Sequence, residues 1–491
     1  MRNVFIGFAI ALVVMGQLHA DWPQFRGPNG SGVATGPEPP IEFGPGKNEL
    51  WHVDLQSGHS SPCVVGDRIF LTTHQPDSKQ LSIVCLNRDD GSTRWQHDIS
   101  VDKIETGHPS FSPASSSPTS DGQRVVAYFG SYGLICLDIA GKQLWEIKLP
   151  LTKSYAGNAI SPIIVDDQVI LYRGNYVDHY LLSVDKETGK ENWKIKQSEK
   201  FTPDMACTGI PIVCDDKLIV HTARSVQAFD LATGKRRWIA NCKTTATSTP
   251  ILAGDEVVVA TWNQTGEEAL TPRYPDYETL LKDNDKNSDG NLAKNEFPKM
   301  MMFHRSEGTE APQNGRPIRF VMVDTNKDGR VGPREWAAWQ KRSDERRKTY
   351  VPHGLIAIKI DSAGEIDVDN IRYLARDGIP EVPSPLLYRD HVYFVKNGGI
   401  LTSVNRVSGE RVARTRTKGR GTHYASPILC GDKIYSSSGD GIITVVQITD
   451  AKPKILAGND MNDGVYATPA IVDGVLYVRT HKKLFAFKRQ Q

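Results

Sequence analysis

Short stretches of alternating apolar and polar residues recur along the chain, and each follows a small residue and a proline. Eight segments share this pattern: SSPCVVGDRIFLTT, SSPTSDGQRVVAYFG, ISPIIVDDQVILYRG, GIPIVCDDKLIVHTA, STPILAGDEVVVATW, PSPLLYRDHVYFVKN, ASPILCGDKIYSSSG and ATPAIVDGVLYVRTH. In most of them an Asp- or Gly-containing pair separates two runs of about five strand-forming residues, which is typical of a β-hairpin. The pattern predicts eight repeated units of short antiparallel strands.

Several units continue into a second motif, a glycine followed four residues later by a tryptophan. The pairs are Gly91/Trp95, Gly141/Trp145, Gly189/Trp193 and Gly234/Trp238. In a later unit Gly409 takes the same place and Ala413 replaces the tryptophan. A large aromatic side chain at one fixed strand position suits the packing of one sheet against the next. We therefore expect a structural role for these tryptophans rather than ligand binding.

The prolines of the eight units are regularly spaced except at one place. They stand at positions 62, 118, 162, 211, 250, 385, 427 and 469. The interval from Pro250 to Pro385 is far longer than the others, and treating residues 265–350 as an insertion restores the common spacing. The rest of the chain then gives repeats of roughly 44 residues, and a four-stranded propeller blade has roughly 40–45 residues.

The two ends of the repeat array complement each other. The last unit ends at LFAFKRQQ without a Gly-x-x-x-Trp strand, whereas GKNELWHVDL supplies a glycine and Trp51 before the first unit. An N-terminal strand that completes the last blade explains both facts, and ring closure removes exposed sheet edges. We therefore expect an all-β, eight-bladed β-propeller closed by an N-terminal strand, with an α-helical insertion in the fifth blade.

The N-terminus differs in composition from the rest of the chain. Arg2 is followed by an apolar run from Val4 to Met15 and by the small residue Ala20, a pattern typical of a secretory signal peptide. No later run approaches the ~18 uncharged apolar residues of a transmembrane helix. We expect an exported protein, periplasmic or secreted, with no transmembrane anchor in the mature chain. The expected organisation is a signal peptide (1–20), a lead segment (21–50), a first propeller part (51–264), the insertion (265–350) and a second propeller part (351–491).

Composition excludes some functions. The net charge of +2 offers no electrostatic basis for a nucleic-acid partner. The seven cysteines are irregularly spaced, and several lie in apolar strand patterns such as SIVCL and GLICL. We expect them to be mostly unpaired and buried, with room for one disulfide. No CxxC or CxxCH occurs, so neither thioredoxin chemistry nor c-type haem attachment is indicated.

The insertion contains two segments with the ligand spacing of calcium-binding EF-hand loops, DKNSDGNLAKNE (285–296) and DTNKDGRVGPRE (324–335). Such loops offer oxygen ligands at positions 1, 3, 5, 7 and 12 and a glycine at position 6. The sequence therefore predicts two Ca²⁺ sites in an EF-hand pair, with position 7 ligating through its carbonyl. The predicted ligands are Asp285, Asn287, Asp289, Asn291 and Glu296 in one loop and Asp324, Asn326, Asp328, Arg330 and Glu335 in the other.

The residues around these loops suggest how the pair is built. Helices are expected at YETLLKDN before the first loop, at EFPKMMMFHR after it and at EWAAWQKRSDERR after the second. Leu292 and Val331, at position 8 of each loop, predict a short β-bridge between the loops. Residues 300–303, with Trp336 and Trp339, are expected to fill the core of the pair; a methionine-lined target groove is the alternative.

In a propeller, the loops that enter the innermost strands line one mouth of the central channel. Five residues are placed near this funnel by the repeat pattern: His59, His108, Lys418, Arg420 and His423. Histidine and basic side chains there could bind an anionic ligand, and ordinary polar loop residues are the alternative. No GxSxG, HExxH or Walker loop occurs, so the sequence predicts no catalytic residue.

The repeats resemble those of quinoprotein-type (PQQ-repeat) β-propellers, notably at SVDKETGKENW (183–193), AFDLATGKRRW (228–238) and the opening DWPQFRGPNGSGV. The resemblance covers about 22–264 and 351–491. Some members of this family are alcohol or sugar dehydrogenases that hold pyrroloquinoline quinone (PQQ) and Ca²⁺ in the funnel, and others are non-enzymatic scaffolds. The chain lacks the adjacent cysteine pair of the dehydrogenases and the lipid attachment site usual in the scaffold subunits.

The motifs and the resemblance together favour an exported, calcium-binding PQQ-like propeller that acts as a non-enzymatic binding or scaffold protein. Its partner would be a protein or a polysaccharide at the propeller face. The alternative is a PQQ-dependent alcohol or sugar dehydrogenase that uses the central funnel. PQQ is thus an alternative cofactor, less favoured than the two EF-hand Ca²⁺ ions.

Overall fold

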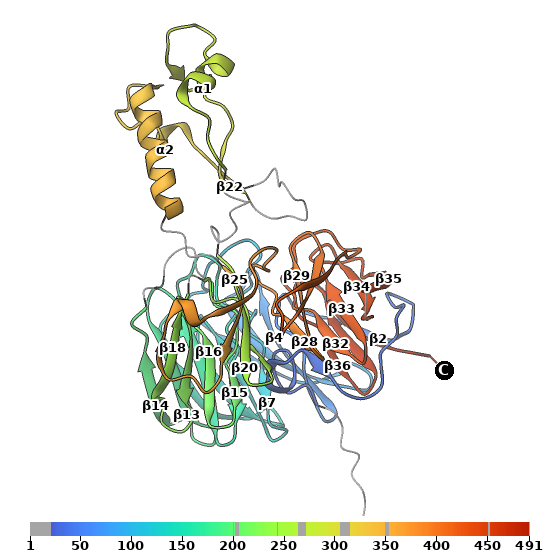
Figure 1. The fold of residues 1–491 in the computed structure, drawn as a ribbon. Coiled ribbons are helices and arrows are strands. Elements are labelled where there is room, and N and C mark those ends of the chain that lie inside the picture. Colours follow the sequence, from blue (N-terminus) through green and yellow to red (C-terminus); the bar gives the residue numbers. More distant parts are fainter. Residues whose placement is uncertain are drawn as a thin grey trace, which may run out of the picture.

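The computed structural model describes residues 21–199, 201, 206–242, 244–263, 272–304, 315–348, 353–449 and 452–490, so the predicted signal peptide over 1–20 lies outside it. The propeller consists of eight sheets, each with four antiparallel strands and two of them extended by a fifth, parallel strand (Figure 1). This confirms the predicted fold. In every blade the first strand begins directly after the repeat proline, because proline can start a strand but cannot donate within one.

The first four blades use consecutive strands. Their bounds are β3 (Cys63–Val65), β4 (Arg68–Gln75), β5 (Gln80–Asn87) and β6 (Thr93–Ser100); β7 (Thr119–Ser120), β8 (Arg124–Phe129), β9 (Gly133–Asp138) and β10 (Gln143–Lys148); β11 (Ile163–Val165), β12 (Gln168–Gly174), β13 (His179–Asp185) and β14 (Glu191–Lys196); and β15 (Ile212–Cys214), β16 (Lys217–His221), β17 (Ser225–Asp230) and β18 (Arg236–Asn241). A fifth strand, β26 (Gly364–Ile366), adds to the outer edge of blade 4 in parallel.

The second four blades contain the insertion and the ring closure. Their bounds are β19 (Ile251–Ala253), β20 (Glu256–Thr261), β25 (Gly354–Lys359) and β27 (Arg372–Ala375); β28 (Leu386–Tyr388), β29 (His391–Lys396), β30 (Ile400–Asn405) and β31 (Arg411–Arg416); β32 (Ile428–Cys430), β33 (Lys433–Ser437), β34 (Ile442–Gln447) and β35 (Lys454–Asp460); and β36 (Ala470–Val472), β37 (Val475–Arg479), β38 (Lys483–Lys488) and β2 (Glu49–Asp54). The N-terminal strand β2 pairs antiparallel with β38 and completes the last blade, as predicted.

The repeat tryptophans hold neighbouring blades together. A Cβ atom on Gly141 would lie 2.7 Å from the Trp95 ring, and one on Gly189 would lie 2.8 Å from the Trp145 ring. The Trp95 indole N–H also donates to the carbonyl of Ile139 in the next blade, at 3.1 Å. Each glycine of a Gly-x-x-x-Trp motif therefore leaves room for the tryptophan of the preceding blade. The predicted structural role of the tryptophans is confirmed.

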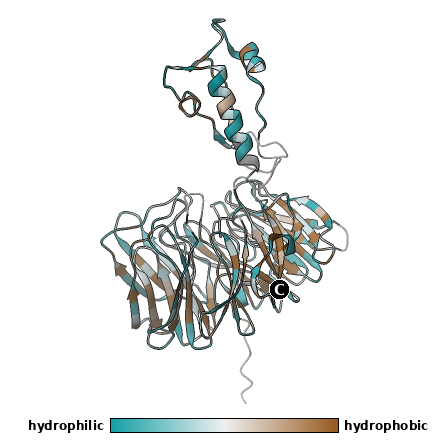
Figure 2. Cartoon of the chain, turned by 60° about the vertical axis from the view of Figure 1, so that its left-hand side comes forward, coloured by the Kyte–Doolittle hydropathy of each residue, from teal (hydrophilic) through white to brown (hydrophobic). Residues whose placement is uncertain are grey.

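The middle strands of the blades are buried on both faces, because each sheet packs between two others, whereas outermost strands such as β6 and β10 keep exposed residues. All six residues of β8 are buried, and Figure 2 shows hydrophobic residues concentrated along the blades. All seven cysteines are free thiols, and all but the half-buried Cys214 are buried. Burial raises the pKa of the Cys85 thiol to about 12, so it stays protonated and inert. The cysteines thus serve as small core residues, and no disulfide links them.

The insertion leaves blade 5 after β20 and returns at β25, between its second and third strands. Its elements are α1 (Tyr277–Asn284), β21 (Leu292–Ala293), β22 (Met301–His304), β23 (Gly315–Pro317), the 3₁₀ turn η3 (Phe320–Met322), β24 (Arg330–Val331) and α2 (Pro333–Lys348). It has a core of its own, in which Met300 and Met302 pack against a cluster containing Trp336 and Trp339. Of the residues 300–303 predicted to fill this core, Met300 and Met302 thus pack against it, and Met301 is not part of the cluster.

One predicted helix of the insertion is wrong. Residues 296–304, the described part of EFPKMMMFHR, form no helix; Met301–His304 is β22, which pairs antiparallel with β23. A strand lets residues 301–304 pair with residues 315–317, and Pro298, in what would be the first turn of a helix, does not itself prevent one. The alternation of the methionines also suits a strand, because Met300 and Met302 can then reach one core from the same face.

Candidate functional site

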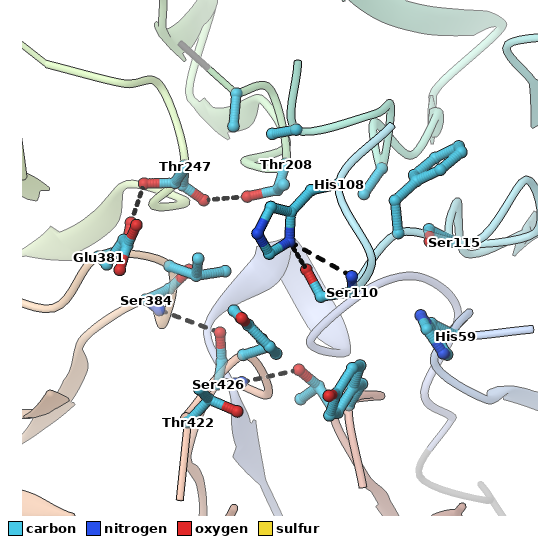
Figure 3. A pocket seen from close by; sticks show the side chains of 18 of the residues that line it. His59, His108, Ser110, Ser115, Thr208, Thr247, Glu381, Ser384, Thr422 and Ser426 are labelled. Atoms are coloured by element: carbon cyan, nitrogen blue, oxygen red, sulfur yellow. Dashed lines mark hydrogen bonds between the residues drawn. The ribbon is translucent and has the colours of Figure 1, made fainter. Parts of the chain in front are cut away.

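A cavity of about 200 Å³ opens where the innermost strands begin (Figure 3). The loop before the first strand of every blade contributes to its lining. Twelve of the 26 lining residues are serine or threonine, and most of the others are aromatic, alanine or histidine. The cavity therefore offers neutral hydrogen-bonding groups together with aromatic surface.

A belt of hydroxyl groups runs around the central channel, and most of its members line the cavity. The residue before the repeat proline uses its side-chain oxygen to accept the amide hydrogen of the equivalent residue in the preceding blade. The belt residues are Ser61, Ser117, Ser161, Thr249, Ser384, Ser426 and Thr468, with amide-to-hydroxyl distances of 2.8–3.1 Å. The bond from Thr468 to Ser61 closes the ring at 3.0 Å. Ile210 of blade 4 is the one member without a hydroxyl.

The lead segment closes the channel below the belt. Trp22 pairs with Val64 of blade 1, and the amide side chain of Asn29 bonds to both backbone groups of Val213 in blade 4. The buried guanidinium of Arg26 donates to backbone carbonyls of blades 6 and 7, including Pro385 at 2.6 Å. Between these anchors Phe25 lines the cavity. The segment 22–34 thus crosses the axis, and Phe25 forms the floor.

Two histidines predicted near the funnel line the cavity, His59 and His108. His59 packs edge-on against Tyr466, with ring centroids 5.0 Å apart, and lies 5.2 Å from the His481 ring. Burial, together with the positive charge of Arg479, lowers the pKa of His59 to about 3, so its ring is neutral near pH 7. His108 Nδ1 accepts from the amide of Ser110 at 3.3 Å and contacts its hydroxyl at 2.8 Å.

The other three predicted funnel residues are not among the residues that line the cavity. Lys418 and Arg420 are exposed at the surface. His423 is buried, its Nδ1 lies 3.0 Å from the carbonyl of Gly421, and burial lowers its pKa to about 4. Its amide donates to Asn397 Oδ1 at 2.7 Å, so His423 supports a residue that does line the cavity.

The wall formed by blades 4 to 6 carries a chain of hydrogen-bonded polar groups. The Thr208 hydroxyl donates to the carbonyl of Thr247 at 2.6 Å, and the Thr247 hydroxyl donates to the carbonyl of Glu381 at 2.5 Å (Figure 3). The Glu381 carboxylate accepts from Asn397 Nδ2 at 3.2 Å. Glu381 is the one acidic residue among the described lining residues. This wall presents hydrogen-bond acceptors to the cavity.

Several of these residues were not predicted from the sequence. Glu381, Asn397, Trp262 and Tyr466 lie in loops whose sequences differ from blade to blade, so no repeat pattern singles them out. The belt could have been predicted from the sequence, because seven of the eight residues before the repeat prolines are serine or threonine.

The neck of the insertion adjoins the cavity. Trp262, which lines the cavity, directly follows β20, and its carbonyl accepts from the amide of Thr245 at 3.0 Å. The next residue, Asn263, contacts His353 on the returning chain, where His353 Nδ1 lies 3.1 Å from the Asn263 carbonyl. The chain leaving β20 and the chain returning to β25 are therefore bonded to each other beside the cavity.

The two predicted calcium loops have the same internal hydrogen bonds. In the first, Asp285 Oδ2 accepts from the amide of Gly290 at 3.0 Å, and Glu296 accepts from the amides of Lys286 and Ala293 at 3.1 and 2.9 Å. In the second, the equivalent acceptors are Asp324 (Gly329 amide, 3.1 Å) and Glu335 (Thr325 and Gly332 amides, 2.8 and 3.2 Å). Asn287, Asp289, Asn326 and Asp328 also accept from loop amides.

These bonds leave one oxygen in each loop unsatisfied. Asp285 Oδ1 and Asp324 Oδ1 are buried and have no hydrogen-bond partner. The loops pair through the predicted bridge, with Leu292 opposite Val331. Across the described residues, no three His, Cys, Asp or Glu side chains converge closely enough to form a metal site. The position 12 glutamates, Glu296 and Glu335, instead accept hydrogen bonds from loop amides. To bind a cation, their carboxylates would have to release these bonds.

The cavity does not fit the quinone and calcium pair of the dehydrogenases. Ca²⁺ takes six to eight oxygen ligands, several of them usually carboxylates. The described lining residues provide a single carboxylate, Glu381, and contain no lysine or arginine to pair with the acidic groups of the quinone.

Comparison with known proteins relates the chain to two kinds of propeller. Residues 44–177 and 79–270 match the family described as outer membrane protein assembly factor BamB, which together is a little under half of the chain. The lanthanide-dependent methanol dehydrogenase of Methylacidiphilum fumariolicum (strain SolV) is 35% identical over 71 residues, 13% of this chain. That match spans only 12% of the methanol dehydrogenase.

Solved structures share the fold over almost the whole chain. A europium-containing methanol dehydrogenase superposes with a TM-score of 0.56 at 10% identity, over 96% of this chain and 98% of the other. A quinohemoprotein alcohol dehydrogenase from Pseudomonas putida HK5 gives 0.53 at 13% identity, over 96% and 80%. BamB from Moraxella catarrhalis gives 0.50 at 12% identity, over 90% and 98%. At such identities the similarity concerns the fold alone.

Proposed function

From the premise that this chain is a propeller of PQQ-like, BamB-type repeats, we propose that it is an exported calcium-binding protein that holds a ligand in its central cavity and does not transform it. The signal-peptide pattern over 1–20 supports export. No helix in the described part of the chain is long and apolar enough to cross a membrane. The comparisons include both an assembly factor and dehydrogenases, so the properties of the site must decide between binding and catalysis.

Calcium binding is carried by one observation, the unsatisfied oxygen in each of the two loops. A buried carboxylate oxygen without a donor costs free energy, and a bound cation would remove that cost. Similar bonding in the two loops, where Asp285 and Asp324 each accept from the amide of the loop glycine, supports the assignment of both aspartates to position 1 of an EF-hand pair. The remaining ligands are those predicted from the spacing. With three carboxylates in each loop, we place the affinity near the weak extracellular range of about 10⁻⁴–10⁻³ M.

Isothermal titration calorimetry tests this assignment. We expect two Ca²⁺ ions per chain, and we expect Glu296→Gln combined with Glu335→Gln to abolish both, because each substitution removes the position 12 carboxylate. Glu278→Gln with Glu345→Gln is a matched control, since both side chains are exposed on the helices of the insertion and outside the loops. Unchanged stoichiometry in the Glu296/Glu335 variant would refute the calcium sites.

A PQQ-dependent dehydrogenase is the second candidate. The 71-residue match to a methanol dehydrogenase and the similarity in fold favour it. The lining of the cavity argues against it, because its described residues offer a single carboxylate and no lysine or arginine. Oxidation of an alcohol or a sugar by the pure protein with added PQQ, Ca²⁺ and an artificial electron acceptor would decide for the enzyme.

A further inference from the structure

Basic residues are concentrated in one part of the chain. Residues 371–420, which run from β27 of blade 5 through blade 6 and into the loop behind it, contain ten lysine or arginine residues and four acidic residues. The whole chain has a net charge of only +2, so the remainder of the chain is net negative. A local excess of one sign of charge indicates an interaction surface for a partner of the opposite sign.

The excess is greatest along β31, the outermost strand of blade 6, and the loop that follows it. Every second residue from 414 to 420 is basic, and Arg411 begins the same row at the other end of β31. Arg414, Arg416, Lys418 and Arg420 all reach the surface, whereas the three residues between them are buried. A strand rises by about 3.4 Å per residue, so β31 alone spreads its three arginines over roughly 17 Å.

Acidic side chains neutralise this row only in part. Asp377 Oδ2 accepts from the Arg411 guanidinium at 3.2 Å and also from Arg414. About half of the Arg411 and Asp377 side chains is exposed, and ion pairs between exposed groups contribute little, so an anionic ligand can compete for these arginines. Within the described residues, neither Lys418 nor Arg420 forms an ion pair with a carboxylate.

Charged side chains on an edge strand can also serve only to prevent pairing with a second chain. Two other outermost strands of this propeller, β10 and β35, each carry one acidic and one basic residue. In contrast, β31 carries three arginines and no acidic residue. Protection of the edge does not require such an excess of one sign.

The basic surface is narrow. Exposed acidic residues lie on both sides of it: Asp367 and Asp369 between β26 and β27 on the side of blade 5, and Asp460 at the end of β35 in blade 7. A flat anionic surface such as a lipid bilayer would approach these acids together with the arginines, whereas a chain that follows β31 would not. The row therefore suits a linear polyanion.

An exported protein meets two kinds of linear polyanion, acidic polysaccharides and acidic peptide segments. A peptide gains most by pairing with the open edge of a strand, but β31 ends at Arg416 and the basic row continues to Arg420. A peptide also loses main-chain and side-chain freedom at every residue that it orders. A chain of linked sugar rings has fewer free torsions for each charge and needs no main-chain partner, so the row favours the polysaccharide.

We propose that the basic row over 411–420 on blade 6 binds a linear acidic polysaccharide through the carboxylate or sulfate groups of its sugars. Arginine suits this role, because its guanidinium donates two parallel N–H bonds to one planar anionic group. None of the five basic residues of the row lines the central cavity. The inference therefore concerns a surface apart from the cavity and the calcium loops, and it goes beyond the proposed function.

Calorimetric titration of the full mature chain tests the ligand class. Heparin and polygalacturonate are the acidic polysaccharides, and dextran is the uncharged control. Polyglutamate and phosphatidylglycerol vesicles represent acidic peptides and membranes. We expect both acidic polysaccharides to bind at low salt and dextran not to bind. The affinity should fall as salt is raised, because salt screens the charges and opposes the release of counterions from the polymer.

Substitutions at both ends of the row connect the binding to this surface. Lys418→Glu combined with Arg420→Glu should weaken heparin binding by at least about tenfold and make its salt dependence shallower, because fewer charges on the polymer are neutralised. Arg411→Glu should also weaken it, since a linear ligand spans the row. Lys190→Glu with Lys196→Glu is the matched control, because it makes the same change in net charge at exposed positions of the outer edge of blade 3.

Several outcomes would overturn the inference. Heparin and polygalacturonate could both fail to bind, or the Lys190/Lys196 variant could lose as much affinity as the Lys418/Arg420 variant, which would make net charge the cause. Tighter binding of polyglutamate or of the vesicles, at an equal concentration of charge, would assign the surface to an acidic protein or to a membrane. Circular dichroism and the Ca²⁺ stoichiometry of the same samples report folding and the calcium sites separately, so a failure of this inference can be told from a failure of the proposed function.

Discussion

Glu105 shows how a single residue couples this fold to pH. Its side chain is 4% exposed, accepts from the Thr152 hydroxyl and has one oxygen, Oε1, without a partner. Burial raises its pKa to about 8, although the Thr152 bond and the charge of Arg173 act in the opposite direction. In the unfolded chain its pKa is near 4.5. Glu105 is therefore protonated in the native protein at neutral pH.

This raised pKa predicts a pH-dependent loss of stability. Between pH 4.5 and about pH 8 the unfolded chain releases a proton that the native protein keeps, so the free energy of unfolding falls as pH rises across this window. Glu105→Gln keeps the shape of the protonated carboxyl and cannot ionise. We expect the variant to gain stability relative to the native protein from pH 5 to pH 8, by up to a few kcal/mol.

Urea unfolding of both proteins at several pH values measures this difference. The exposed Glu410→Gln is the control, and its stability should follow that of the native protein at every pH. Parallel profiles for Glu105→Gln and the native protein would show that Glu105 is already ionised in the folded state.

At the scale of elements, the contact between a tryptophan and the glycine of the next blade is what joins neighbouring sheets. Gly189 has a φ of 70°, and an added Cβ would lie 2.8 Å from the Trp145 ring. Gly66 also has a positive φ, 57°, but nothing lies within 4 Å of its Cβ position. Substitution at Gly66 therefore measures the cost of the backbone conformation alone, whereas substitution at Gly189 adds the cost of a steric clash.

Alanine substitutions at these two glycines should differ in effect. Both should lose about 1 kcal/mol for the left-handed backbone. Gly189→Ala should lose a further 1–3 kcal/mol or so, because the methyl group would push Trp145 away from the next blade. Denaturant midpoints give both values. Equal losses at the two positions would mean that the tryptophan moves aside without cost.

At the scale of the whole molecule, the propeller should fold without its insertion. Strands β20 and β25 pair from Glu256 opposite Lys359 to Thr261 opposite Gly354, and the contact between Asn263 and His353 lies outside this ladder. The pairing of β20 with β25 thus does not depend on residues of the insertion. The insertion also has a core of its own, built around Trp336 and Trp339.

Replacement of residues 265–350 by a short Gly/Ser linker should therefore give a folded protein with an all-β circular dichroism spectrum and cooperative melting. Loop closure entropy changes only slowly with length, so the exchange costs little. Deletion of residues 49–54 is the contrasting control, since it removes β2 and opens the ring at β38. An unfolded linker variant at room temperature would show that the insertion is needed for the propeller.

The sequence by itself determined the parts of this protein that depend on local patterns. Strand alternation, turn residues and the Gly-x-x-x-Trp motif recur within each repeat, so they predicted eight blades, the closing strand at Trp51 and the interruption of the fifth blade. The loop spacing also singled out ten candidate Ca²⁺ ligands, which stay a prediction. The helix predicted after the first loop failed, because the pairing of β22 with β23 is a contact between distant residues.

The position and the lining residues of the cavity follow only from the tertiary structure. Its floor comes from Phe25 and its walls from eight loops spread from His59 to Thr468, which meet because the ring closes. Single-residue differences among those loops do not show in a repeat pattern, so the sequence could not indicate that Glu381 faces the cavity while Lys418 and Arg420 face solvent. Positions within one repeat are set by the geometry of a strand, but convergence on a common axis is set by how the blades pack.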